Sequence, residues 1–364
     1  MDLDRQFDLQ ARACERLGSP LYAALCRSMI DDIRDGGPCA RVLTGYEQSE
    51  LAAAVPLRLL AAVHALALSG AAPELAACYP SAGGKSEPGS EPLVWKAFRE
   101  VVDTREEWIR DWLTRPPQTN EVGRSVPLLA GLLAAVDATP LPIRLLELGS
   151  SAGLNLRADH FRWRAGDIAW GPEGSPVTVP DAWQGPVPGW LAEAVRRHPS
   201  VTVVERRGCD PTPLDPASPR DALALRSYVW PDQVERFARL DGALRVAARV
   251  PAEVSRIGAA DFLAGIEPIP GVLTVVWHSV MWQYVPKPEW AAVSAELDRL
   301  AATTGPGSGF AHIAFEPQDT SDDRHGFRLT ARIGTQPPIV LARAKPHGVP
   351  AFLYSGDQPE PAPS

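Results

Sequence analysis

An acid followed by small residues at alternate positions marks the most informative stretch of the sequence. The stretch RLLELGSSAGLNL reads as an apolar strand and a turn, and it places Glu147, Gly149, Ser151 and Gly153 two positions apart. Small residues allow a ligand to approach the backbone closely. The carboxylate of Glu147, at the end of the strand, would supply negative charge beside a cationic group. The pattern predicts a binding site where a strand meets a helix.

The spacing distinguishes between three kinds of glycine turn. A phosphate-binding loop, GxxxxGK[ST], would need glycine where the chain has Leu154, and no lysine follows. A dinucleotide fingerprint, GxGxxG, would need glycines at Ser151 and Leu154. The acidic pattern [D/E]xGxGxG fits with the single change of glycine to Ser151. The failed fingerprint counts against a nicotinamide oxidoreductase, which remains the weakest alternative.

The acidic glycine turn resembles the nucleotide-binding turn of class I methyltransferases. The resemblance implies a Rossmann-like α/β core and S-adenosylmethionine as the cofactor. Glu147 would lie near the ammonium group of that cofactor. A helix N-terminus beginning near Gly153 would favour its carboxylate by about 0.3–1 kcal/mol. A purely structural strand–helix turn is the alternative interpretation of the same residues.

The next two strand-like segments carry further acids. Asp210 stands in RGCDPTPLD, which resembles a superfamily pattern whose acid binds both ribose hydroxyls through charge-assisted hydrogen bonds. Glu205 is the alternative ribose candidate, and a turn-forming role for Asp210 stays open. In RIGAADFLAGI, the resemblance implies that Asp261 contacts the adenine amino group, with Phe262 as its apolar neighbour. Asp261 could equally cap a helix.

The fourth strand-like segment leads into possible reacting groups. Ligands bind outside the carboxyl ends of parallel strands, which places the segment HSVMWQY beside the donor methyl group. We expect His278 to act as a general base near neutral pH, with Tyr284 as the second candidate. Ser279, Trp282 and Gln283 would line the substrate pocket. A buried histidine held by a carbonyl is the alternative. No histidine spacing such as HExxH occurs, so no metal is predicted.

The whole chain also resembles an uncharacterised bacterial family, a domain of unknown function with a methyltransferase-like fold. The segments that carry this resemblance are QTNEVGR (118–124), LELGSSAGLNL, RGCDPTPLD, VWPDQ and VWHSVMWQY. In the first, Asn120 could cap a helix, or the segment could overhang the glycine turn. Arg124 would then pair with the cofactor carboxylate. In VWPDQ, Trp230 and Asp232 are candidate pocket residues, although their direction stays open.

The apolar pattern predicts two domains. Up to about residue 135, apolar residues recur three and four positions apart, as in helices; beyond it, strand-like runs alternate with helices. We expect a helical cap domain at 1–135 and a Rossmann-like domain at 136–364, an α/β fold with a doubly wound, mostly parallel sheet. A Trp- and Pro-rich stretch at 161–191 predicts a hairpin insertion that could form a pocket wall. The last two strand-like runs predict an antiparallel pair at the sheet edge.

Composition and charge exclude several classes of protein. The net charge of −8 argues against nucleic acid and anionic membranes as partners. The five cysteines form no CxxC pair and the polar, acidic start resembles no signal peptide, so we expect a reduced cytoplasmic protein. The longest apolar run carries Pro56, Arg58 and His64, which favours a buried helix over a membrane span.

Together these patterns predict S-adenosylmethionine-dependent methyl transfer to a small-molecule acceptor. The main alternative is a regulatory or complex subunit that binds the cofactor or a nucleotide without turnover. Two features keep that alternative open: Ser151 replaces a glycine, and the chain has no Asn-Pro-Pro-Tyr acceptor motif. The sequence leaves the acceptor, its pathway and the oligomeric state open.

Overall fold

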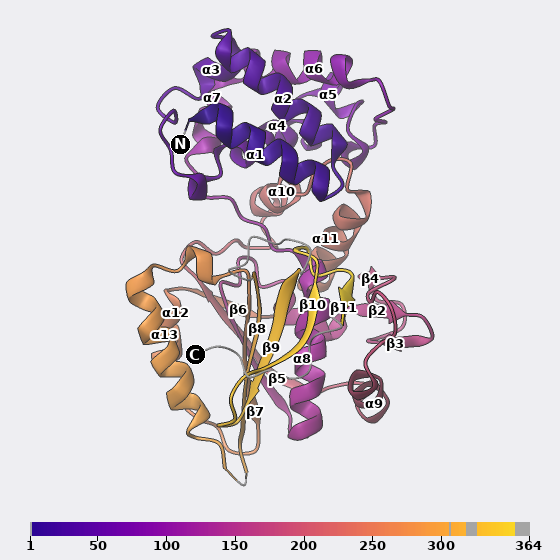
Figure 1. The fold of residues 1–364 in the computed structure, drawn as a ribbon, viewed down its shortest axis with the longest axis vertical. Coiled ribbons are helices and arrows are strands. Elements are labelled where there is room, and N and C mark those ends of the chain that lie inside the picture. The colour runs from indigo at the N-terminus through magenta and orange to yellow at the C-terminus, as the bar shows by residue number, and fades with distance from the viewer. Residues whose placement is uncertain (1, 306, 318–325, 354–364) are drawn as a thin grey trace. The chain divides into compact units, whose positions relative to one another are not determined.

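The chain divides into two compact units, each described here by itself. The computed structural model describes residues 2–305, 307–317 and 326–353. The helical unit comprises the residues up to Thr119 together with Ser218–Ala238, and the sheet unit comprises Asn120–Ala217 and the residues from Arg239 onward. Figure 1 shows the helices of the first unit and the sheet of the second. The boundary therefore differs from the expected division at residue 135.

Tertiary packing explains this difference. Helix α8 (Ser125–Ala138) was expected at the end of the helical domain, but it packs on strands of the sheet. The segment 218–238, far along the chain, returns to the helical unit. Local periodicity cannot show which of two cores an apolar helix joins, since it records only that one face is buried.

The helical unit is a bundle of short helices with side-chain caps. Asp2 accepts a hydrogen bond from the backbone of Asp4, and Ser19 from the backbone of Tyr22, so that two helices begin with the polar caps that free N–H groups require. The α-helices of this unit are α1 (Leu3–Arg16), α2 (Pro20–Arg34), α3 (Pro38–Val42), α4 (Val55–Leu68), α5 (Pro73–Ala76), α6 (Glu91–Thr104), α7 (Glu106–Leu113) and α10 (Pro219–Ser227). Helix α11 (Val234–Ala247) begins in this unit and leads into the other.

Two residues expected in a substrate pocket are used inside the helical unit. Trp230 is buried in its apolar core, with its ring centroid 6.3 Å from that of Tyr22. Asp232 accepts hydrogen bonds from the Ser19 hydroxyl at 2.6 Å and from the Leu21 backbone at 3.2 Å. Packing and helix capping therefore replace the substrate-pocket interpretation of Trp230 and Asp232.

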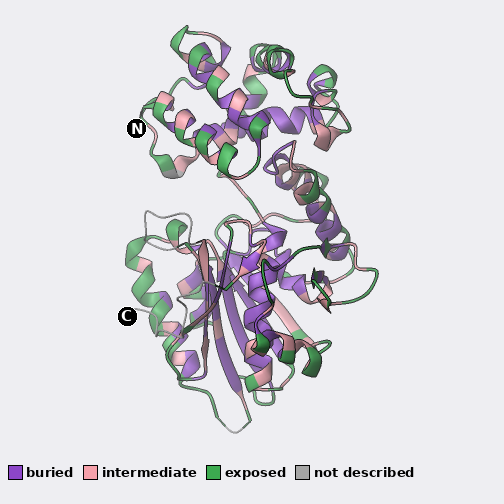
Figure 2. Ribbon diagram, turned by 45° about the vertical axis from the view of Figure 1, so that its right-hand side comes forward, coloured by how far each residue is buried: buried purple, intermediate pink, exposed green. Residues whose placement is uncertain are grey.

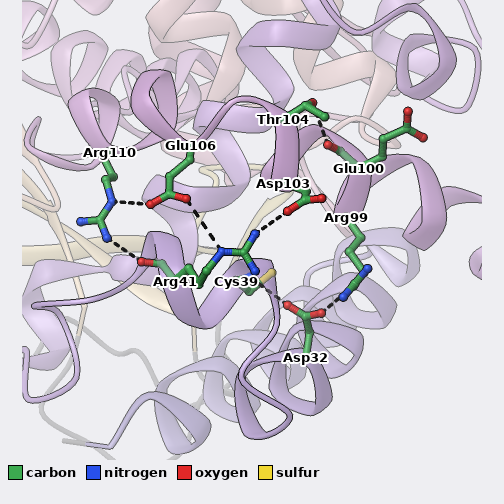
Figure 3. Close-up of polar contacts among 9 residues, drawn as sticks. All are labelled: Asp32, Cys39, Arg41, Arg99, Glu100, Asp103, Thr104, Glu106 and Arg110. Carbon is green, nitrogen blue, oxygen red and sulfur yellow. Dashed lines mark hydrogen bonds and ion pairs between the residues drawn. The ribbon is translucent and has the colours of Figure 1, made fainter.

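Ion pairs connect the helices of this unit (Figure 3). The carboxylate of Asp32, at the end of α2, accepts hydrogen bonds from Arg99 Nε at 2.7 Å and from the Cys39 backbone at 2.8 Å. It thereby joins α2, α3 and α6. A more exposed group of ion pairs links α3 with α6 and α7 through Arg41, Asp103, Glu106 and Arg110. Exposed pairs contribute at most about 1 kcal/mol each, so the buried carboxylate is the stronger link.

A histidine lies at the centre of the helical unit. His64 has no exposed surface, and its Nδ1 and Nε2 lie 3.0 Å from the Ser227 carbonyl and 2.7 Å from the Ser81 hydroxyl. Burial lowers the pKa of His64 from 6.5 to about 4. The imidazole is therefore neutral at neutral pH and must be charged or exposed in acid.

We expect acid to destabilise the protein through His64. Its folded-state pKa is depressed, so its contribution to stability is present above pH 6.5 and is lost as the pH falls toward 4. Between pH 7 and pH 4.5 this loss amounts to about 2–3 kcal/mol. Urea unfolding followed by tryptophan fluorescence should show a correspondingly smaller pH dependence in His64→Gln. The half-buried His160 provides a control: the same dependence in His64→Gln and His160→Gln would contradict the expectation.

The sheet unit is built on a mixed, largely parallel sheet of eight strands in the order β11-β10-β9-β8-β7-β1-β5-β6. The strands from β6 to β8 pair in parallel, and those from β8 to β11 pair antiparallel. This confirms the expected antiparallel pair. The strands are β1 (Ile143–Leu148), β5 (Val203–Asp210), β6 (Glu253–Arg256), β7 (Leu273–Ser279), β8 (Gly309–Glu316), β9 (Phe327–Ile333), β10 (Ile339–Ala344) and β11 (Ala351–Phe352).

Helices cover both faces of this sheet. A Cβ added at Gly131 of α8 would lie 2.6 Å from the Ile313 side chain, so Ile313 faces α8. Phe310 lies an odd number of positions away, hence on the opposite face, and it belongs to a core with residues of α12 (Ala259–Ala264) and α13 (Lys287–Ala301). Figure 2 shows the central strands as buried. Helices on both faces explain why every residue of β1 is buried, the charged Arg144 and Glu147 included.

The Trp- and Pro-rich insertion forms a hairpin, as expected, and a helix, α9 (Gly189–Arg197). Its strands β2 (Arg162–Ala165) and β3 (Ile168–Trp170) pair antiparallel, and β4 (Thr178–Val179) joins β2. Beyond β4 the chain pairs with β11: Gln184 N–H donates to the Ala351 carbonyl at 2.7 Å, and Ala351 N–H donates to the Ala182 carbonyl at 2.9 Å. The insertion thus covers an edge of the large sheet, which limits edge-to-edge association.

Candidate functional site

The order of the strands reverses at β1. The chain adds β5 and β6 on one side of β1, then returns to place β7 and β8 on the other side. In open α/β sheets, ligands bind outside the carboxyl ends of the strands at such a reversal. The residues that follow β1, β5, β7 and β8 are therefore those whose geometry decides what the site can hold.

The turn after β1 is left-handed at three alternate positions. Gly149, Ser151 and Gly153 have φ angles of +66°, +53° and +65°. For serine this conformation costs about 1–2 kcal/mol, and a hydrogen bond from its N–H to Asp210 Oδ2 at 2.9 Å supports it. Ser151 therefore adopts the backbone conformation expected of the glycine that it replaces.

Glu147 is buried at the end of β1. Only 2% of its surface is exposed, and its Oε2 makes no hydrogen bond to any residue that the structure describes. Burial raises the pKa of this carboxyl well above 4.5, Arg157 opposes that shift, and Asp210 adds to it. A buried oxygen without a partner is costly, so this position suits a ligand that donates hydrogen bonds and carries positive charge.

The two ribose candidates lie at opposite ends of β5. Asp210 ends the strand, and its carboxylate accepts hydrogen bonds from the N–H groups of Ser151 and Thr212 at 2.9 and 2.8 Å. Glu205 lies near the amino end, opposite Arg144 in register and 2.7 Å from its Nε. Its position excludes Glu205 from the carboxyl edge. Asp210 therefore links the turns after β1 and β5, which agrees with the turn-forming alternative. A carboxylate can accept further hydrogen bonds beyond these two.

The segment 120–124 overhangs the glycine turn through Asn120. Asn120 Oδ1 accepts a hydrogen bond from Leu154 N–H at 2.9 Å. That N–H is the kind of group expected to attract a cofactor carboxylate, and Asn120 occupies it. Arg124, the expected carboxylate partner, donates from Nε to the Pro346 carbonyl at 3.2 Å. Its contact with the loop after β10 gives Arg124 a structural role, and its pairing with a cofactor carboxylate stays a prediction.

His278 is fully buried in the sheet, which contradicts its expected role as a general base. Its Nδ1 lies 2.7 Å from Glu316 Oε1, and its Nε2 lies 3.0 Å from His312 Nε2. Both ring nitrogens therefore have partners, and neither is left for a substrate. Burial, with smaller effects of His278 and Arg332, holds the pKa of His312 well below its usual range.

The loop after β7 closes over the glycine turn. Val280, a β-branched residue, has a φ of +55°, which is strained. Met281 donates its N–H to Glu316 Oε1 at 2.9 Å, and its Cγ lies 2.8 Å from the position of a Cβ added at Gly149. The loop is thus fixed on one side by β8 and fits closely against Gly149 on the other.

The other residues expected near the donor methyl group differ in their exposure. Ser279 ends β7 and is half-buried. The Trp282 ring is perpendicular to that of His278, with centroids 5.5 Å apart. Gln283 is exposed, and 65% of Tyr284 is accessible to solvent. Trp282 therefore makes an aromatic contact with the buried histidine.

The adenine candidates lie in α12, which follows β6. Asp261 is exposed in the first turn of the helix, whose N-cap is Gly258, so the capping interpretation of Asp261 is wrong. Phe262 is buried in the core, and the Arg207 guanidinium lies 5.7 Å from its ring centroid. An adenine contact of Asp261 remains a prediction, while Phe262 contributes mainly to packing beneath it.

Comparison with known proteins identifies the family. The sequence matches the family described as an uncharacterized protein conserved in bacteria (DUF2332) over residues 4–352. The chain belongs to this family. No curated protein and no solved structure matches it. The match confirms the resemblance of the whole chain, while the methyltransferase core stays a prediction.

Glu316 is the residue of this DUF2332 protein that our reading of the sequence missed. It ends β8, and its Oε1 is the hydrogen-bond partner of His278 Nδ1 and of Met281 N–H. The signal was present, because GFAHIAFE ends a buried strand with an acid as IRLLEL nearly does with Glu147. Glu147 and Glu316 therefore share one sequence signal, an acid at the carboxyl end of a buried strand.

The described part of the chain shows neither a metal-binding cluster nor a membrane-spanning helix. Within residues 2–305, 307–317 and 326–353, no three or more His, Cys, Asp or Glu side chains are grouped so as to hold a metal ion. In the same ranges, no helix has the length and apolar character needed to cross a membrane.

Proposed function

We propose that the sheet unit binds S-adenosylmethionine at the carboxyl ends of β1 and β5 and transfers its methyl group to a small-molecule acceptor. The observation that carries this proposal is the unpartnered Oε2 of buried Glu147 beside three left-handed turn residues. An ammonium group would satisfy that oxygen, because it supplies both a hydrogen-bond donor and a positive charge. The strand order β6-β5-β1-β7-β8 supports a Rossmann-like core.

Each group of the turn has a part in this proposal. Glu147 binds the ammonium group, and Asp210 accepts hydrogen bonds from the ribose while it holds Ser151 in place. Met281 limits the depth of the site above Gly149. When bound, S-adenosylmethionine supplies an electrophilic methyl group, and alignment of the acceptor with the carbon–sulfur bond provides most of the rate.

A cofactor-binding protein without turnover is the second candidate. Burial of His278 between Glu316 and His312 favours it, since the expected base is not accessible. The two candidates share the ligand site and differ in the acceptor subsite. Loss of the methyl donor over time in the presence of candidate acceptors distinguishes them.

Isothermal titration with S-adenosylhomocysteine tests the proposed ligand. We expect saturable binding of one ligand per chain and no binding of NAD⁺, because the turn lacks the glycines of a dinucleotide fingerprint. No heat and no thermal shift at millimolar S-adenosylhomocysteine would contradict the proposal. Binding of NAD⁺ alone would favour the oxidoreductase alternative.

Asp210→Asn should weaken S-adenosylhomocysteine binding by about 1.5–3 kcal/mol, the scale of hydrogen bonds to a charged group. The amide retains one oxygen, so it can still accept a hydrogen bond from Thr212 or Ser151, and the fold should persist. Titration measures the affinity, and thermal unfolding measures the stability. Asp215→Asn, in the exposed turn beyond, is the control. Unchanged affinity with reduced stability would limit Asp210 to its turn role.

A further inference from the structure

We infer that Glu316 forms the acceptor subsite and that the acceptor is a protonated amine. This inference rests on the proposed function, because it concerns the group that receives the methyl. Its basis is the geometry around the end of β8.

Glu316 lies close to the glycine turn. Strand β8 pairs with β7 and β7 with β1, all in parallel, so the carboxyl ends of the three strands share one edge. Met281 connects that edge, since its N–H binds Glu316 Oε1 at 2.9 Å while its side chain packs against Gly149. A single residue therefore separates the Glu316 carboxylate from the turn proposed to hold the cofactor.

The two oxygens of Glu316 differ. Oε1 accepts hydrogen bonds from Met281 N–H and from His278 Nδ1 at 2.7 Å. Oε2 is buried and has no hydrogen-bond partner in the part of the chain that the structure describes. Two donors thus fix the carboxylate, while one oxygen is left to accept a hydrogen bond. An ammonium group supplies both the donor and the compensating charge.

The histidine pair supports the orientation of this carboxylate. When Glu316 is ionised, His278 donates from Nδ1 to Oε1, and its Nε2 interacts with His312 Nε2 at 3.0 Å. His278 is thereby held as a positioning residue, and the carboxylate cannot turn without breaking this chain of contacts. The centroid of the adjoining Trp282 ring lies 5.5 Å from that of the His278 imidazole. This ring adds an aromatic surface of the kind that attracts cations.

The proposed step conserves atoms and charge. The ammonium group gives one proton to Glu316 Oε2 and becomes a neutral amine. The nitrogen lone pair then forms a bond to the methyl carbon, while the carbon–sulfur pair passes to sulfur, which becomes a neutral thioether. The product is a methylated ammonium, and the carboxylic acid of Glu316 returns its proton to solvent.

Sinefungin, which carries an amine at the position of the transferred methyl, tests the placement of Glu316. We expect the protein to bind sinefungin about 10- to 100-fold more tightly than S-adenosylhomocysteine, the scale of one hydrogen bond to a charged group. Glu316→Gln should abolish this preference while retaining an acceptor for Met281. Glu289→Gln, at an acid that caps α12, should retain it. If Glu316→Gln does not fold, Glu316→Asp must show the same loss.

The amine class is tested separately, with S-adenosylhomocysteine bound. Benzylamine should raise the melting temperature of this complex more than benzyl alcohol does, and Glu316→Gln should remove the difference. Equal effects of amine and alcohol would overturn the amine assignment, and a sinefungin preference that survives in Glu316→Gln would overturn the placement. If neither S-adenosylhomocysteine nor sinefungin binds, the proposed function itself fails, which is a distinct outcome.

Discussion

Glu147→Gln is expected to reduce the affinity for S-adenosylhomocysteine by about 2–5 kcal/mol, the scale for removal of one partner from a buried charge pair. The glutamine side chain has the same size, but it places a neutral amide where the proposed ammonium group needs a carboxylate. Isothermal titration measures this loss. Glu289→Gln, the same change at an acid that caps α12, is the control. An unchanged affinity would show that Glu147 does not face the ligand.

The same substitution should stabilise the free protein above acidic pH. The pKa of Glu147 is raised in the folded state, so its favourable contribution is present below about pH 4.5 and is lost as the pH rises toward the folded-state value. Glutamine cannot ionise and avoids this loss. Urea unfolding should give a higher free energy of unfolding for Glu147→Gln than for the unchanged protein, and the difference should grow between pH 5 and pH 8. A constant or reversed difference would contradict the assignment of burial as the cause.

Gly149→Val should abolish ligand binding, with an expected loss of about 3 kcal/mol or more from crowding and strain. A Cβ at Gly149 would lie 2.8 Å from Met281 Cγ, and its φ of +66° disfavours a β-branched residue. The branched side chain would therefore displace either the loop after β7 or the ligand. Titration with S-adenosylhomocysteine measures the loss, and thermal unfolding shows whether the variant folds.

Gly166→Val separates backbone strain from crowding. Gly166, in the hairpin insertion, has a φ of +60°, and a Cβ there would meet nothing within 4 Å. Both variants should therefore be destabilised by the strain of a valine in the left-handed conformation, whereas only Gly149→Val should fail to bind the ligand. Normal binding by a folded Gly149→Val protein would show that the turn is structural only.

The sequence predicted those parts of the fold that depend on local pattern. Mainly apolar runs of strand length, such as IRLLEL, indicated parallel strands, because a strand covered on both faces is buried along its whole length. The antiparallel pair followed from strand-like runs without a helix between them, and the hairpin insertion followed from a Trp- and Pro-rich stretch. The unit boundary did not follow, since α8 is apolar around most of its surface and the sequence does not say which core receives it.

The candidate site divides in the same way. The left-handed turn at Gly149, Ser151 and Gly153 was predictable, because its residue types act on their own backbone. The contacts that occupy both ring nitrogens of His278 were not predictable. They depend on His312 and Glu316, which lie beside His278 only once β8 has paired with β7. Contacts made by sheet pairing across many residues leave no periodic signal in the chain.

The contact between residues 182–184 and β11 joins two segments that are synthesised far apart in time. A chain emerges from the ribosome at about 5–20 residues per second, N-terminus first, so Trp183 and its neighbours are exposed well before Ala351 exists. Closing so long a loop costs entropy before any contact compensates for it. The contact between residues 182–184 and β11 is therefore among the last parts of the sheet unit to form. Until β11 has been synthesised, the nascent chain carries an unprotected strand edge that other chains can pair with.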